Sequence, residues 1–228
     1  MSYEFATNFK KVPNESEDSI IRNVNLLISY LDLLLEQDYG SGDLKKFVNE
    51  ILNYLKKLLN RFRSNLDEEI DYHSWIARNT YELFVLTKYG LQSHEKVSEV
   101  ILTAVDDYRD IRKKLFKDSE PVEEDVDRVE FLSSMEKLDS IIDEHEIDIE
   151  KWKSTGQMAN ETDLNFEHGI IFKLTSKYVH PTSLFLFGNK NFVQGKDSKK
   201  AIFSSTQWYA AKLITYMPNR IEELKSAT

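Results

Sequence analysis

The sequence of 228 residues contains no cysteine. This absence excludes disulfide frameworks, zinc ribbons, cysteine-ligated iron–sulfur clusters and cysteine nucleophiles. It is also typical of the reducing cytoplasm, where we predict that the protein resides. Glycine and proline are scarce, at 7 and 4 residues, and a composition so poor in turn-forming residues favours long helices over disorder.

Long apolar runs are absent as well. No uncharged apolar stretch of roughly 18 residues occurs, so we expect no membrane span. Residues 1–14 lack the basic segment and apolar run of a signal peptide, and we interpret them as an N-terminal extension. Residues 15–228 can bury one substantial core, because 41% of the chain is hydrophobic, and we predict a single helical domain there.

Common enzyme signatures are also missing. The chain has no glycine-rich nucleotide-binding loop, no Gly-x-Ser-x-Gly motif and no His-Glu-x-x-His zinc motif. The Glu-x-x-His pairs of di-iron helical bundles do not occur either. We therefore expect neither a metal nor another cofactor.

The net charge of −9 argues against general nucleic-acid binding, because a negative field repels phosphate. The charge is concentrated in one region, however. Residues 118–150 contain 14 acidic side chains and two basic ones, which leaves +3 for the rest of the chain. We predict that this acidic region forms an exposed helical face on which Asp125, Asp143 and Glu146 meet solvent. His145 is interpreted as part of the same solvated face.

Hydrophobic periodicity predicts three helices in the first part of the chain. Apolar residues recur at three- and four-residue steps over 15–37, and again in a helix that follows the predicted N-cap Asp43. A third helix is predicted over 67–89, with Gly90 as its stop. This third helix is nearly apolar from Trp75 to Leu86, so we expect it to be central.

Further helices are expected in the second part, whereas no strand-like alternation occurs. Helices are predicted over 93–116, from about 119 onward, over about 163–179 and over 197–217. Pro218 should break or kink the last of these helices. Residues 151–161 are interpreted as an exposed connection. The predicted fold class is therefore all-α, a single-domain bundle of about six to eight helices.

Two pairs of polar residues stand out within apolar helical segments. Arg78 and Glu82 are four residues apart on the predicted central helix, and Ser176 and His180 are four apart on a later one. Residues at this spacing share a helix face. If the two helices are neighbours, four polar side chains converge in an apolar setting.

Two interpretations of this cluster remain open. In the structural one, Arg78 and Glu82 form an ion pair, because a buried arginine needs a carboxylate partner, and His180 only caps its helix. In the functional one, Arg78 binds an anionic group, His180 supplies a group that titrates near neutrality, and Glu82 orients one of them. The candidate catalytic residues are Arg78, Glu82, Ser176 and His180, and the candidate substrate-binding residues are Asn79, Tyr178 and Thr182.

At these residues the chain resembles an uncharacterised family of bacterial helical proteins, a domain of unknown function. The resemblance rests on Arg-x-x-x-Glu at Arg78 and Glu82 and on Ser-x-x-x-His-Pro-Ser/Thr from Ser176 to Thr182. It spans roughly residues 66–187. It implies a helical fold and these positions, and no reaction.

A second resemblance is to the HEPN superfamily, all-α domains that include ribonucleases of toxin–antitoxin and anti-phage systems. Those enzymes carry Arg, a polar residue and, four to six residues later, His on the same helix. Arg78-Asn79 begins in this way, but Leu83, Phe84 and Val85 stand where His should follow. Only His180 from another helix could take its role.

These observations lead to two hypotheses. The first is a non-enzymatic helical module that recognises a protein or a small ligand, in a bacterial defence or toxin–antitoxin setting by resemblance alone. The second is a metal-independent ribonuclease or phosphodiesterase that uses Arg78 and His180. Under this alternative only, RNA is a partner, held by cationic residues on the second helix and around Lys196, Lys199 and Lys200. The sequence leaves the oligomeric state open.

Overall fold

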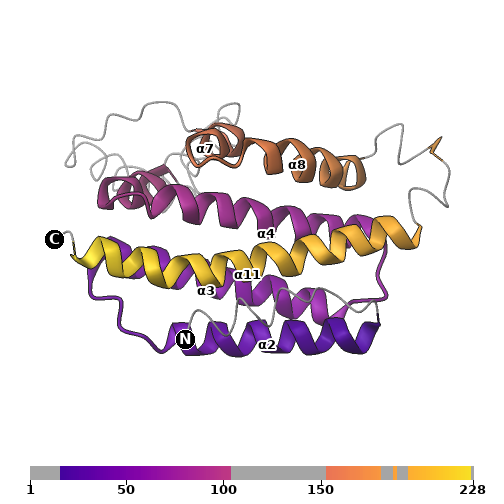
Figure 1. The fold of residues 1–228 in the computed structure, drawn as a ribbon, viewed down its shortest axis with the longest axis horizontal. Coiled ribbons are helices and arrows are strands. Elements are labelled where there is room, and N and C mark those ends of the chain that lie inside the picture. Colours follow the sequence, from indigo (N-terminus) through magenta and orange to yellow (C-terminus); the bar gives the residue numbers. More distant parts are fainter. Residues whose placement is uncertain (1–15, 104–152, 181–186, 189–194, 227–228) are drawn as a thin grey trace, which may run out of the picture.

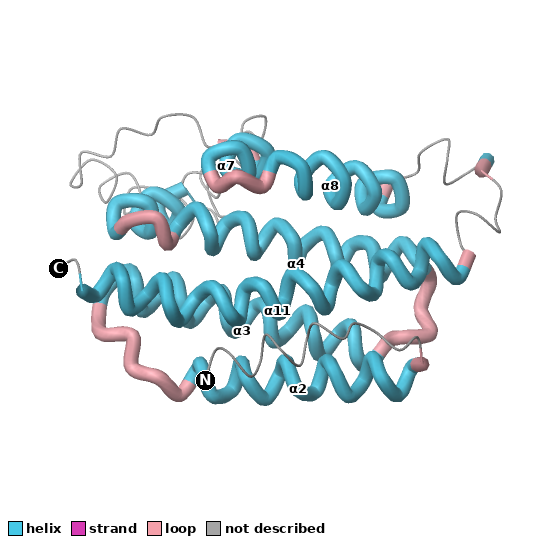
Figure 2. The backbone as a smooth tube through the Cα atoms, in the orientation of Figure 1, coloured by secondary structure: helices cyan, strands magenta, loops and turns pink. Residues whose placement is uncertain are grey.

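The structure, a computed structural model, describes residues 16–103, 153–180, 187–188 and 195–226. These residues form helices joined by loops, with no strand among them (Figures 1 and 2). The predicted all-α helical bundle is therefore confirmed. Residues 94–103 are helical, and the other helices are α2 (Glu17–Leu35), α3 (Gly42–Ser64), α4 (Ile70–Gly90), α7 (Thr155–Glu161), α8 (Asn165–Val179) and α11 (Lys196–Ser226).

Several predictions concern residues outside these ranges. They include the N-terminal extension, the acidic region 118–150 with Asp125, Asp143 and Glu146, and Thr182. The helices predicted over 93–116 and from 119 are described only as far as residue 103. Within the described ranges, no helix is long and apolar enough to cross a membrane.

Helix α3 begins earlier than predicted. Its N-cap is Ser41 rather than Asp43, and the Asp43 carboxylate instead accepts a hydrogen bond from Ser98 Oγ at 2.8 Å. The preceding turn requires glycine, because Gly40 and Gly42 adopt φ angles of 80° and 73°.

Helix α4 ends at Gly90, within one residue of the predicted end, and Leu91 is its C-cap. The glycine is also needed for packing. A Cβ atom at this position would lie only 2.7 Å from the Phe47 ring of α3. The missing side chain therefore lets α3 and α4 approach closely.

Helix α7 occupies most of the segment that was interpreted as an exposed connection, so that interpretation is wrong. The Ser154 side chain accepts the backbone N–H of Gln157, and the Gln157 side chain accepts that of Ser154, which forms a capping box. Met158 and Ala159 are buried, and α7 packs against α4. These two apolar contacts hold the short helix in place.

Helix α8 ends at Val179, as predicted, but its N-cap is Leu164 rather than Thr162 or Asp163. Asp163 instead adopts a positive φ of 56° between the two helices. The Thr162 hydroxyl donates to Met158 O at 2.8 Å and so belongs to the end of α7.

Pro218 does not break helix α11, which continues through it to Ser226. Proline removes one backbone donor, and this ordinarily destabilises a helix interior. Here Met217, Ile221 and Leu224 on both sides of the proline are buried. Their burial offsets the lost hydrogen bond.

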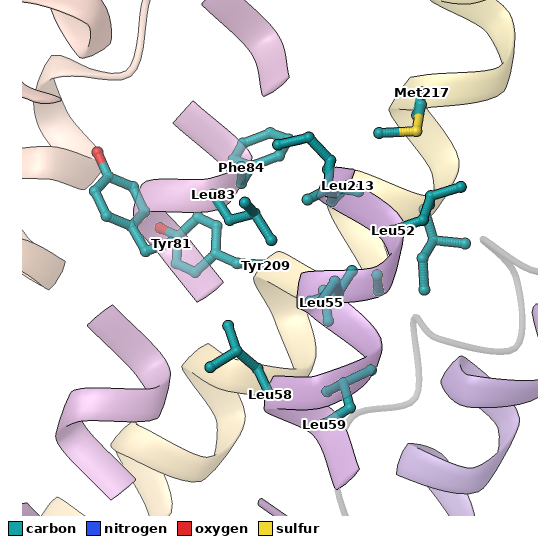
Figure 3. Packing of buried hydrophobic residues seen from close by; sticks show 14 of the residues in the cluster. Leu52, Leu55, Leu58, Leu59, Tyr81, Leu83, Phe84, Tyr209, Leu213 and Met217 are labelled. Atoms are coloured by element: carbon teal, nitrogen blue, oxygen red, sulfur yellow. The ribbon is translucent and has the colours of Figure 1, made fainter. Parts of the chain in front are cut away.

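Helix α4 is central, as its apolar stretch predicted. It packs against α3, α7, α8 and α11, and Figure 1 shows it between α8 and the layer that contains α3 and α11. The core beneath it joins side chains from three helices (Figure 3): Leu52, Leu55, Leu58 and Leu59 of α3, Tyr81, Leu83 and Phe84 of α4, and Tyr209, Leu213 and Met217 of α11.

Candidate functional site

The candidate site begins with an ion pair on α4. Arg78 Nε donates to Glu82 Oε1 at 2.9 Å, one turn further along the helix. The two side chains are 21% and 31% exposed, so the pair is reachable from solvent and is not a fully buried structural pair. Glu82 occupies only the Nε edge of the guanidinium and fixes its plane.

Helix α8 supplies the other half of the site. Its residues His168, Phe172, Ser176 and His180 are spaced four apart and therefore form one oblique stripe. The Arg78 guanidinium carbon lies 4.3 Å from the centre of the Phe172 ring. An arginine stacked on an aromatic face gains a cation–π attraction that holds it in place.

Two polar groups of this stripe meet the same nitrogen of Arg78. Arg78 Nη1 donates to Ser176 Oγ at 3.3 Å and lies 3.4 Å from His180 Nε2. His180 is exposed and is also the C-cap of α8, with its N–H donating to Ser176 O at 3.4 Å. All four candidate catalytic residues therefore meet at one place, although they come from segments about 100 residues apart.

The candidate substrate-binding residues lie elsewhere. Asn79 donates to Trp75 O at 2.7 Å and accepts from Tyr54 of α3 at 3.3 Å, so it faces α3. Tyr178 is buried in the core at 4% exposure. Thr182 lies outside the described residues.

His168 belongs to the cluster, although the sequence analysis gave it no role. Its ring stacks on Phe172 with centroids 4.7 Å apart, and it lies 5.9 Å from the ring of Tyr81. Burial lowers the pKa of His168, and the nearby charges act in opposite directions: Glu82 raises this pKa and Arg78 lowers it. The four-residue spacing to Phe172, Ser176 and His180 was the signal that could have identified it.

Two polar atoms next to the cluster are buried without a hydrogen bond to any described residue: the hydroxyl of Tyr81 and Nδ1 of His168. In Figure 3 the Tyr81 hydroxyl points away from the leucine side chains of α3. Burial raises the pKa of Tyr81 well above its ordinary value, so the hydroxyl stays protonated. It is thus a neutral hydrogen-bonding group on the side chain that lies next to His168.

A salt bridge connects α8 to α11 beside the cluster. Lys212 Nζ lies 3.5 Å from Glu167 Oε1, and Lys212 also lies over the rings of Tyr209 and Trp208, at 5.3 Å from each centre. Helix α8 is therefore held against both α4 and α11.

The arrangement offers a cation, a hydroxyl and an imidazole within one small volume. Such a set can bind a carboxylate or phosphate group, and an imidazole beside a cation is also a group that can transfer a proton. In the part of the chain that the structure describes, no three His, Cys, Asp or Glu side chains gather closely enough to hold a metal ion.

Comparison with known proteins identifies a family. No curated protein and no solved structure is significantly similar to the chain. The profile of a family of unknown function, DUF5677, matches residues 73–197, more than half of the sequence. The matched region contains Arg78, Glu82, Ser176 and His180. The chain therefore belongs to this family of unknown function, DUF5677.

Proposed function

We propose that this protein is a helical binding module that recognises the anionic group of a small ligand at the cluster of Arg78, Glu82, Ser176 and His180. The observation that supports this proposal is the pair of contacts at Arg78 Nη1, 3.3 Å to Ser176 Oγ and 3.4 Å to His180 Nε2. A ligand oxygen placed beside these three groups would accept hydrogen bonds from Arg78 and the Ser176 hydroxyl, and from His180 in the tautomer whose Nε2 carries the proton.

The surroundings of Arg78 favour binding because they hold the guanidinium before a ligand arrives. Glu82 takes its Nε edge and Phe172 lies against its face. A side chain that is already ordered loses less conformational entropy on binding. The planar guanidinium also matches the geometry of carboxylate and phosphate groups.

The net charge of the cluster limits the kind of ligand. Arg78 and Glu82 neutralise each other, so attraction of a highly charged polymer would be weak. A small ligand held mainly by directed hydrogen bonds suits the site better. The lack of cysteine supports a cytoplasmic location for the module, whereas a defence or toxin–antitoxin setting rests on the HEPN resemblance alone.

A second candidate function is metal-independent cleavage of a phosphodiester. It is favoured by one observation, the contact of a histidine ring nitrogen and a serine hydroxyl with the same arginine nitrogen. The cations that were expected to hold RNA on α3 support it less. Lys56 pairs with Asp32, Arg63 donates to Asn25 and Asn60, and Arg61 lies over Trp75, so their charges are partly engaged within the protein.

Replacing Arg78 with lysine should weaken anion binding about tenfold, because the ammonium keeps the charge but loses the planar fork. The binding can be followed through the histidine ring signals in NMR spectra of the full chain, titrated with inorganic phosphate and with acetate. We expect the His180 signals to shift and saturate. Arg61→Lys, a surface arginine on α3, is the matched control and should leave the titration unchanged.

The same samples separate the two functions. Incubation with single-stranded RNA should yield no cleavage if the protein is a binding module, and cleavage that Arg78→Lys and His180→Ala both abolish would support the phosphodiesterase instead. Histidine signals that do not respond to phosphate or acetate would contradict the proposed binding function.

A further inference from the structure

A groove of about 400 Å³ lies between α2 and α11, away from the Arg78 cluster. A volume of this order accommodates a small organic molecule. No residue of α8 contributes to it. The lining residues are Glu17 and Ile20 of α2, Leu66 of the loop between α3 and α4, and Lys196, Asp197, Lys199, Lys200, Phe203, Ser204 and Gln207 of α11.

The inner surface of the groove is apolar and well supported. Ile20, Leu66 and Phe203 are each less than 10% exposed. The Phe203 ring packs edge-on against Phe62 and His73, with centroids 5.0 and 4.5 Å away. These contacts fix the floor, which can therefore receive the apolar body of a ligand.

A hydrogen bond ties the two helices together at this floor. Asn23 of α2 donates to Gln207 Oε1 at 3.2 Å, and Gln207 Nε2 donates to Phe203 O at 3.1 Å. Gln207 is only 1% exposed. The separation of α2 and α11 is thus set by an internal contact, so the groove is present before a ligand binds.

The charge that reaches into the groove is positive. Lys199 is half-buried, and its Nζ lies 5.5 Å from the centre of the Phe203 ring and donates to Glu68 O at 3.3 Å. Burial lowers the pKa of the nearby His73, and the positive charge of Lys199 lowers it further. The two carboxylates of the lining, Glu17 and Asp197, are exposed. Because solvent screens exposed charges more than half-buried ones, Lys199 dominates inside the groove.

We infer that this groove binds a small organic anion, with its phosphate or carboxylate head at Lys199 and its apolar body on Phe203, Leu66 and Ile20. At the exposed rim, the charges of Lys196 and Lys200 are offset by those of Glu17 and Asp197, so Lys199 supplies the net positive charge of the groove. The site is independent of the Arg78 cluster. It gives the protein a second ligand site, on the opposite side of α4 from the stripe on α8.

Calorimetric titration of the full chain tests this inference with four probes: phenyl phosphate, phenylacetate, inorganic phosphate and benzyl alcohol. We expect one of the two aromatic anions to bind at least tenfold more tightly than inorganic phosphate or benzyl alcohol, because only they satisfy both the lysine and the apolar floor. Tighter binding of phenyl phosphate would identify a phosphate head group, and tighter binding of phenylacetate would identify a carboxylate. Equal affinity for all four, or binding of none, would overturn the inference.

Variants of the lining residues test whether the aromatic anion binds in the groove. Lys199→Gln should weaken the tighter aromatic anion about tenfold, since a charge-assisted contact is lost. Ser204→Phe should remove the binding by filling the groove, while Lys57→Gln, an exposed lysine on α3, should have no effect. Thermal melts of each variant establish that the fold is intact. If Lys199→Gln and Ser204→Phe bind as the parent does, the groove is not the site. Phosphate and carboxylate probes also bind at the Arg78 cluster under the proposed function, so the titrations are repeated with Arg78→Lys. The preference for an aromatic anion should remain in this variant, which separates the groove from the proposed function.

Discussion

Replacing Phe84 with alanine should lower the free energy of unfolding by about 3–5 kcal/mol, the usual cost of removing a large aromatic from a core. Phe84 is 5% exposed on the central helix. It packs against Tyr209 and Tyr216 of α11, with ring centroids 5.8 and 6.4 Å away. Urea titrations of the parent and the variant measure the difference.

Trp75→Ala is the informative comparison for this prediction. Both residues lie in the apolar stretch of α4, and from the sequence alone the same loss would be expected for each. In the structure Trp75 is only half-buried and lies near Arg61 at 5.7 Å. Its replacement should therefore cost roughly 1–2 kcal/mol. A loss below about 1 kcal/mol for Phe84→Ala would show that α4 is not central.

Acidification from pH 7 to pH 4 should remove about 3 kcal/mol of stability through His73 alone. The side chain is fully buried, and this burial, together with the charge of Lys199, lowers the pKa of His73 from 6.5 to about 4. The unfolded chain therefore binds a proton near pH 6.5, whereas the folded protein binds it only near pH 4. Stability due to the neutral ring is present at pH 7 and falls as pH drops through this window.

His73→Phe isolates this contribution. Phenylalanine keeps an aromatic ring among Phe62, Tyr72 and Phe203, which surround His73, and it cannot be protonated. Urea titrations at pH 7, 5.5 and 4 measure the free energy of unfolding. It should fall more steeply with decreasing pH in the parent than in the variant, because the other groups titrate equally in both. Parallel pH profiles would mean that the folded protein protonates His73 as readily as the unfolded chain does.

The helical fold could be predicted because its signals are local. Three- and four-residue periodicity located α2, α3, α4 and α8 within a few residues of their ends, and the apolar stretch of α4 indicated its central place. Errors arose where tertiary contacts outweigh local preference. Helix α11 continues through Pro218, and buried residues lie on both sides of it. At Gly90 the sequence indicated the helix end but not the close approach of Phe47, which is a tertiary contact.

The candidate site was predictable in part for the same reason. Spacing alone placed Arg78 with Glu82 and Ser176 with His180, but only the packing of α8 on α4 brings the pairs together. The burial of the ion pair was not predictable: its two side chains are 21% and 31% exposed rather than enclosed. Asn79 was nominated through its neighbour Arg78, although consecutive residues of a helix face different directions, and it faces Tyr54 instead.

His180→Ala provides the most direct test of a ligand site at Arg78. One pair of titrations on this variant, urea unfolding and phosphate binding, separates a functional role from a structural one. His180 is exposed at the end of α8, so its removal should change the free energy of unfolding by less than about 0.5 kcal/mol. The affinity for phosphate should nevertheless fall about tenfold, because one of the groups beside Arg78 Nη1 is lost. A variant that binds phosphate as the parent does, yet unfolds far more easily, would show that the cluster only holds α8 against α4.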